Sequence, residues 1–135
     1  MRVRVKGAKH LPRSVRADNL AEATATLAEW FGIDRIITVR IRCYDVGLMG
    51  SVSVEGCRKP VGLDLFADQI EKWARRRRKS IREGYAVTLA HEMVHMSQEH
   101  RGSSGIPEAA EEAEALSLER VFAPYAIKIL RGEGA

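Results

Sequence analysis

Apolar and polar residues alternate in four short stretches of the chain, and this pattern predicts β-strands. The stretches are RVRVK at residues 2–6, RIITVRIRCY at 35–44, GSVSVEG at 50–56 and KPVGLDLF at 59–66. In the second stretch every other residue from Ile37 to Cys43 is apolar, so these side chains are expected to share one buried face. Glycine-bearing turns separate the later stretches, which is typical of a small sheet.

Apolar residues at helical spacing predict a first helix over residues 14–31. The positions expected to face the core are Leu20, Ala23, Leu27 and either Trp30 or Phe31. Gly32 follows as a helix stop, because glycine readily adopts the left-handed conformation that ends a helix.

The second half of the chain is expected to be helical. One segment runs over residues 67–98, with a break near Lys79 or Gly84. The sequence HRGSSGIP closes this segment, and Pro107 is well placed to begin another helix. That helix is expected to run to about residue 121 or 122, because Pro124 would kink or end it.

These elements follow the order β-α-β-β-β-α-α, so the predicted class is α+β, a small sheet packed on helices. A length of 135 residues, 45% of them apolar and 30% charged, fits one globular domain over residues 1–135. We divide it into a helix-and-sheet part (1–66), a helical part (67–100) and a last helix with its tail (107–131).

Hydropathy and cysteine content predict a cytoplasmic protein without a membrane partner. The chain has no apolar run near the roughly 20 residues that a membrane span needs, and its first residues lack the apolar segment of a signal peptide. Cys43 and Cys57 have no CxxC spacing, so we expect two buried thiols.

The net charge of +4 comes largely from the sequence WARRRRKSIRE, which includes the basic run Arg75–Lys79. A basic run can bind nucleic acid, but here no aromatic residues alternate with the basic ones to stack on bases. The pattern is more typical of a solvated helix face, so we do not expect nucleic acid to be the main partner.

His91 and His95 stand four positions apart in the sequence HEMVH, inside the long helical segment. Residues i and i+4 share one face of a helix, so both imidazoles could bind one metal ion. Glu92 lies about 100° around the helix from His91, where it could face a water on the metal without being a ligand. Zinc lowers the pKa of such a water, and a carboxylate can take its proton. Two surface histidines are the alternative, but the preceding apolar run YAVTLA favours a buried helix.

Catalytic zinc needs a third protein ligand and an open fourth position. His100 is a candidate, but a helix that continues from His95 would turn it to another face. The next helix has an acidic start that could supply a carboxylate or simply complement the helix dipole. Its candidates are Glu108, Glu111, Glu112 and Glu114.

HEMVH followed by an acidic helix resembles the gluzincins, zinc peptidases whose third ligand is a glutamate. EAEALSLE at 112–119 is similar to the ExEA signature of HtpX-type membrane peptidases, ImmA-type peptidases and short phage-encoded zincins. The resemblance covers roughly residues 85–122, and the short chain is similar in size to the minigluzincins. It implies a zincin-like fold with a small mixed sheet, and Zn²⁺ as the cofactor.

The identity of the third ligand depends on how the signature is aligned. In the ExEA signature the first glutamate binds zinc and a small residue follows three positions later, which maps to Glu112 and Ala115. A thermolysin-like alignment makes Glu114 the ligand and Ser117 the small residue. Helical phase does not settle the choice and also allows Glu111. We favour Glu112 and keep Glu114 as the main alternative.

One position departs from the family pattern. The gluzincins often carry Asp or Asn four residues after the glutamate ligand, where it supports a histidine. This chain has Leu116 or Leu118 there, so the support for the histidines must come from elsewhere.

The sequence thus predicts a zinc-dependent peptidase, in which Glu92 activates water against the carbonyl of a peptide or protein substrate. MGSVSVE at 49–55 is the candidate sheet edge for binding that substrate as an added strand. The candidate donors to the oxyanion are Tyr85, His100, Arg101 and Tyr125, and the sequence selects none of them. The alternatives are a zincin-fold binding or regulatory protein with a structural or vestigial metal, and a basic nucleic-acid module.

Overall fold

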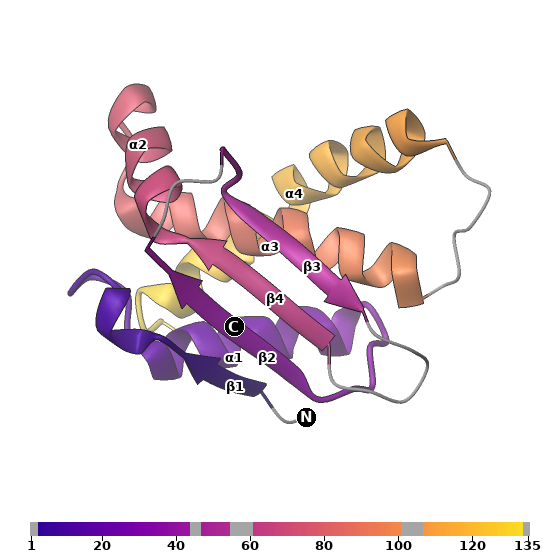
Figure 1. Cartoon of the computed structure of the whole chain (residues 1–135), viewed down its shortest axis with the longest axis horizontal. Coiled ribbons are helices and arrows are strands. Elements are labelled where there is room, and N and C mark those ends of the chain that lie inside the picture. Colours follow the sequence, from indigo (N-terminus) through magenta and orange to yellow (C-terminus); the bar gives the residue numbers. More distant parts are fainter. Residues whose placement is uncertain (1–2, 44–46, 55–60, 101–106, 134–135) are drawn as a thin grey trace.

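The computed structural model describes residues 3–43, 47–54, 61–100 and 107–133 (Figure 1). The strands within these ranges are β1 (Val3–Lys6), β2 (Ile37–Arg42), β3 (Gly50–Val54) and β4 (Val61–Phe66). The helices are α1 (Ala17–Trp30), α2 (Ala67–Arg77), α3 (Ile81–His100) and α4 (Glu108–Leu130), with a 3-10 turn at Ala8–His10. The predicted α+β class and the sheet of about four strands are confirmed.

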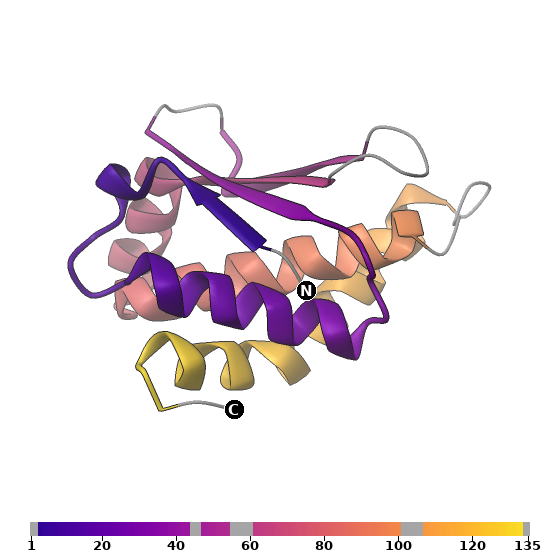
Figure 2. The same cartoon turned by 90° about the horizontal axis from the view of Figure 1, so that it is seen from below.

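The four strands form one mixed sheet in the order β1-β2-β4-β3. β1, β2 and β4 run parallel, whereas β3 pairs with β4 in the antiparallel direction and lies at the edge of the sheet. Figure 2 shows all four α-helices on one side of this sheet, with α4 beneath α1 and α3. The sheet therefore has one face covered by helices.

The two central strands explain this arrangement through their alternating side chains. The inward-facing residues are at most 3% exposed and are Ile37, Val39, Ile41, Val61, Leu63 and Leu65. Burial of each large aliphatic side chain contributes about 1.5–3 kcal/mol. On the opposite face Asp64 lies between two arginines, 3.7 Å from Arg40 and 3.4 Å from Arg42. The helices therefore cover the apolar face, and the opposite face carries ion pairs between Asp64 and the two arginines.

α1 buries the side chains that its helical spacing predicted, although the helix begins at Ala17 rather than at residue 14. Leu20, Ala23 and Leu27 are at most 1% exposed, whereas Trp30 is 44% exposed at the end of the helix. Gly32 has a φ of 70°, as expected for a glycine that ends a helix.

The helical segment predicted over residues 67–98 is two helices, α2 and α3, so the fold has one helix more than predicted. The break falls next to Lys79, where Arg78 adopts the left-handed conformation with a φ of 54°. Gly84, the other predicted break, lies inside α3. A Cβ atom there would come within 2.9 Å of Cγ2 of Ile70, so the glycine allows α2 and α3 to pack closely.

α4 continues through Pro124 to Leu130, so the predicted end near residue 121 or 122 is wrong. Proline removes one helical hydrogen bond and costs about 3 kcal/mol in a helix interior. Beyond it, Ala126, Ile129 and Leu130 are at most 1% exposed. Their burial in the core offsets the cost and keeps the chain helical.

The prediction of two buried thiols is wrong for Cys43, which is exposed. β2 ends at Arg42, so Cys43 lies beyond the sheet, with its Sγ 3.6 Å from Oδ1 of Asp68. Cys57 and Arg101 lie outside the described residues, as does one end of each of the four predicted strands (2, 44, 55–56 and 59–60).

The basic run from Arg75 to Lys79 is exposed, at the end of α2 and in the turn that follows it. Arg75 forms an ion pair with Glu71 one helical turn earlier, with an N–O distance of 2.6 Å. In the described part of the chain, every helix is too short or too polar to span a lipid bilayer.

Candidate metal centre

α3 places the two histidines of HEMVH one helical turn apart. Both rings are partly buried, and their Nε2 atoms lie 3.2 Å from each other. The rest of this half of the helix faces the interior through side chains that are at most 1% exposed, which are Leu89, Ala90, Met93, Val94 and Met96. Rotation of α3 would expose these apolar groups, so core packing fixes the direction in which the histidines point.

Glu112 of α4 contacts both histidines. Its Oε1 lies 2.8 Å from Nε2 of His91, and its Oε2 lies 3.1 Å from Nε2 of His95. These three side chains are the one group of potential metal ligands found among the described residues, and their ligand atoms all lie within 4.8 Å of one another.

The donor set fits a first-row divalent metal. Two imidazole nitrogens and a carboxylate oxygen are ligands that zinc accepts, with bonds of about 2.0–2.2 Å and tetrahedral geometry. Such bonds place neighbouring ligand atoms about 3.3 Å apart, close to the 3.2 Å between the two Nε2 atoms. Small adjustments of Glu112 would close the group around an ion and leave a fourth position open.

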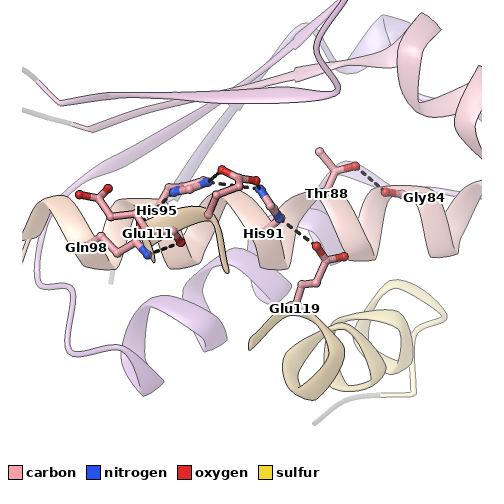
Figure 3. Close-up of polar contacts among 8 residues, drawn as sticks. Gly84, Thr88, His91, His95, Gln98, Glu111 and Glu119 are labelled. Carbon is pink, nitrogen blue, oxygen red and sulfur yellow. Dashed lines mark hydrogen bonds and ion pairs between the residues drawn. The ribbon is translucent and has the colours of Figure 1, made fainter. Parts of the chain in front are cut away.

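Glu119 supports His91 from two turns further along α4. Its Oε1 lies 2.9 Å from Nδ1 of His91 (Figure 3). This hydrogen bond is the main reason why the pKa of His91 is raised above its usual value, although burial opposes the shift. The contact favours the tautomer in which Nδ1 carries the proton and Nε2 is free for a metal.

Gln98 supports His95 from within α3. Its Oε1 accepts a hydrogen bond of 2.8 Å from Nδ1 of His95, and its amide nitrogen donates to the Glu111 carbonyl at 2.8 Å (Figure 3). The same nitrogen lies 3.1 Å from Oε1 of Glu114. Gln98 therefore holds the ring of His95 and links α3 to the start of α4.

The other acidic candidates lie apart from the histidine pair. Glu114, the main alternative ligand, accepts a hydrogen bond from Gln98 and is not part of the group formed by His91, His95 and Glu112. Glu111 meets the site through its backbone carbonyl, and Glu108 is exposed in the first turn of α4. The side chain of His100 lies outside what the structure describes.

Glu92 lies next to the metal ligand group without joining it. Its side chain is 9% exposed, and burial is the largest cause of its raised pKa. A Cβ atom on Gly50 would come within 2.8 Å of Cγ of Glu92 and 3.0 Å of Cγ2 of Thr88. Thr88 is itself fixed by a 2.7 Å hydrogen bond to the Gly84 carbonyl (Figure 3). Glycine at the start of β3 thus lets the edge strand approach Glu92 closely.

A cleft of about 590 Å³ opens beside Glu92 and His91. It follows α3 towards its N-terminus and reaches Trp73 and Arg77 of α2 and Arg120 of α4. The residues around Gly50 line the cleft as well. The cleft therefore joins the start of the edge strand β3 to the candidate metal centre.

Two of the oxyanion candidates lie elsewhere. Tyr85 is 1% exposed and borders a separate small cavity beside His10 and Glu71, and burial raises the pKa of its hydroxyl. Tyr125 packs edge-on against Trp30, with 5.1 Å between the ring centroids. Neither tyrosine lines the cleft.

The sequence of the chain was compared with models of protein families and with curated protein sequences. Neither comparison found a match.

Proposed function

We propose that this protein is a zinc-dependent peptidase of the gluzincin type, with His91, His95 and Glu112 as the zinc ligands. The observation that carries the proposal is the position of Glu92. Glu92 lines the cleft together with His91, is 9% exposed, and is not one of the three residues of the His-His-Glu group. A group that only held a metal would not need a second buried carboxylate at this place.

Glu92 would move the proton in the proposed reaction. A bound zinc ion would polarise the peptide carbonyl and lower the pKa of water at the open position. Burial raises the pKa of Glu92, which makes its carboxylate a better proton acceptor and, once protonated, a usable donor to the leaving amine. Glu119 and Gln98 would keep the imidazoles in the orientation that binds metal.

β3 offers the backbone against which a substrate could lie. It forms the edge of the sheet beyond β4 and begins at Gly50, directly against Glu92. An extended peptide could pair with the free side of this strand through main-chain hydrogen bonds. Its scissile carbonyl would then lie near Glu92 and the metal ligand group.

The proposal is tested by zinc stoichiometry and hydrolysis measured on the same preparations. Native mass spectrometry should show one zinc per chain for the wild-type protein and for Glu92→Gln. Glu92→Gln should lower kcat on a peptide library by at least about 1,000-fold, because general base and general acid roles are lost together. Glu99→Gln, an exposed change on the same helix, is the matched control. Wild-type rates in Glu92→Gln would contradict the proposal, as would a protein that binds no zinc after reloading.

A binding or regulatory protein with a structural metal is the second candidate. It is favoured by the hydrogen bonds that hold both imidazoles, since such support suits a metal that only stabilises the α3–α4 pair. One zinc per chain without hydrolysis of any peptide would select this candidate. Hydrolysis that chelation abolishes and zinc restores would exclude it.

A further inference from the structure

The end of the cleft away from the metal ligand group is basic and aromatic. Arg77 and Trp73 come from α2, and Arg120 comes from α4. The guanidinium carbon of Arg77 lies 5.3 Å from the centroid of the Trp73 ring, so the ring orients this charge beside the cleft. Leu48 and Leu116, both more than half exposed, add apolar surface to the walls.

Both arginines are available to bind an anion. Among the residues that the structure describes, neither Arg77 nor Arg120 forms an ion pair, in contrast to Arg75 on the same helix. The cleft also contains two carboxylates. Glu119 accepts a hydrogen bond from His91. Glu92 is buried beside Gly50, at the end of the cleft near the metal ligand group. Two arginines from separate helices therefore line the cleft, and Arg120 also borders the neighbouring pocket.

The position of Glu92 indicates which part of a substrate reaches the arginines. In the proposed reaction Glu92 delivers a proton to the leaving amine, so the residue after the scissile bond begins beside it. From Glu92 the cleft extends towards Arg77 and Arg120, and neither His95 nor Glu112 lines it. The side chain that follows the scissile bond would therefore enter the basic end.

We propose that this basic end binds a carboxylate on the residue that follows the scissile bond, which makes the protein selective for acidic peptides at that position. The inference rests on the proposed peptidase function. Arginine binds carboxylates through charge-assisted, often bidentate hydrogen bonds, and Trp73 and the two leucines would contact the apolar stem. The carboxylate can be the side chain of Asp or Glu, or the free end of a peptide chain.

The test compares matched peptides with the zinc-loaded protein. Cleavage sites are first mapped by mass spectrometry on a library of peptides, and the best sequence is then made in three forms. The residue after the scissile bond is Glu in an amidated peptide, Gln in an amidated peptide, or Gln as the last residue with a free carboxylate. The Glu form should have a kcat/KM about 10–100-fold above the amidated Gln form, the range expected for a charge-assisted pair. A comparable gain for the free-acid form would identify the chain terminus as a second source of the carboxylate.

Three single variants locate the effect. Arg77→Gln and Arg120→Gln should each lower the advantage of the Glu form over the amidated Gln form by about tenfold. Arg76→Gln removes the same charge from an exposed position of α2 outside the cleft and should preserve the advantage. Equal cleavage of all three peptides would overturn the inference, as would an advantage that survives in the Arg77→Gln/Arg120→Gln double variant.

A binding measurement separates this inference from the peptidase proposal. Fluorescein-labelled forms of the three peptides, or of a mixed-sequence peptide with fixed Glu or Gln if nothing is cleaved, are titrated with the Glu92→Gln protein by anisotropy. Tighter binding of the Glu form that is lost in the arginine variants would support the carboxylate site even without hydrolysis. Equal binding of the Glu and Gln forms, or binding of neither, would overturn the carboxylate site whether or not the protein is a peptidase.

Discussion

The two histidines of the candidate metal centre are held by different kinds of neighbour. His91 donates to the Glu119 carboxylate, which comes from α4, the helix that also supplies Glu112. His95 donates to the neutral amide of Gln98, three residues away on its own helix. One imidazole thus depends on the docking of a second helix and on a charge, whereas the other is supported locally.

This difference has a consequence for metal affinity. A charged acceptor forms a stronger hydrogen bond than a neutral one and makes the imidazole a better ligand. The raised pKa of His91 reflects this, since the hydrogen bond to Glu119 is its largest cause. Gln98 instead shares its amide with the backbone and side chain of α4. We infer that Glu119 mainly tunes the ligand and that Gln98 mainly joins the two helices.

The largest loss of zinc affinity is expected for Glu112→Gln. Glu112 contacts both imidazoles, and loss of its charge should weaken zinc binding by more than about 100-fold if it is the proposed ligand, beyond the range seen when a ligand's supporting residue is lost. Competition with a chromophoric chelator measures the affinity. Glu114→Gln is the matched control and should change it by less than about threefold. A larger loss of zinc affinity in Glu114→Gln than in Glu112→Gln would identify Glu114 as the ligand. The hydrogen bond from Gln98 to Glu114 would then belong to the metal centre and not only link α3 to α4.

A smaller loss is expected for Glu119→Ala, about 10–100-fold in zinc affinity. The variant leaves the Nδ1 proton of His91 without its acceptor and lets the ring turn. Glu119→Gln keeps an acceptor but removes the charge, so it should recover part of the affinity. Glu108→Gln, an exposed change on the same helix, serves as the control for net charge. Equal zinc affinities of Glu119→Ala and wild type would show that the hydrogen bond from His91 to Glu119 does not strengthen zinc binding.

The sequence was sufficient to predict the strands and the positions of both histidines, because period-2 and i, i+4 patterns are local. In β2 and β4 apolar side chains alternate along the strand and face the core. α3 places His91 and His95 one helical turn apart, as their spacing predicted. The course of α4 past Pro124 was not predictable in this way. It depends on the burial of Ala126, Ile129 and Leu130 against distant parts of the chain, which overrides the local effect of proline.

The supporting residues were missed for a similar reason. Glu119 lies seven positions after Glu112 and so shares a helix face with it. This spacing can be read from the sequence, but the segment contains several other glutamates and the spacing alone does not single out Glu119. Gln98 lies three positions after His95, which is also a local spacing, yet nothing marks a glutamine as a ligand support. The arginines of the cleft come from α2 and α4. Only the packing of both helices on α3 brings them together.

Gly50→Ala should lower the rate of hydrolysis without a comparable loss of zinc affinity. The three atoms nearest to the added Cβ would be Cγ of Glu92 at 2.8 Å, Cγ2 of Thr88 at 3.0 Å and the Asp64 carbonyl oxygen at 3.1 Å. We expect kcat to fall about tenfold, equivalent to about 1.4 kcal/mol of barrier, while zinc affinity stays within about threefold. Ser51→Ala, the next residue of β3, is the control. A parallel loss of zinc would show that β3 also positions the ligands.

Among the variants that remove a hydrogen bond to a histidine, Gln98→Met is expected to weaken zinc binding least, by about 3–10-fold, because His95 keeps its place on a buried helix. The effect on folding should be larger than for Glu119→Ala. The methionine removes both hydrogen bonds from Gln98 to α4, those to the Glu111 carbonyl and to the Glu114 carboxylate. At about 0.5–1.5 kcal/mol for each bond, the expected cost is about 1–3 kcal/mol in the free energy of unfolding. Urea unfolding of the zinc-free proteins measures this cost without any contribution from the metal. If Glu119→Ala destabilises the zinc-free protein more than Gln98→Met does, the assignment is reversed: the carboxylate then joins the helices and the amide tunes the ligand.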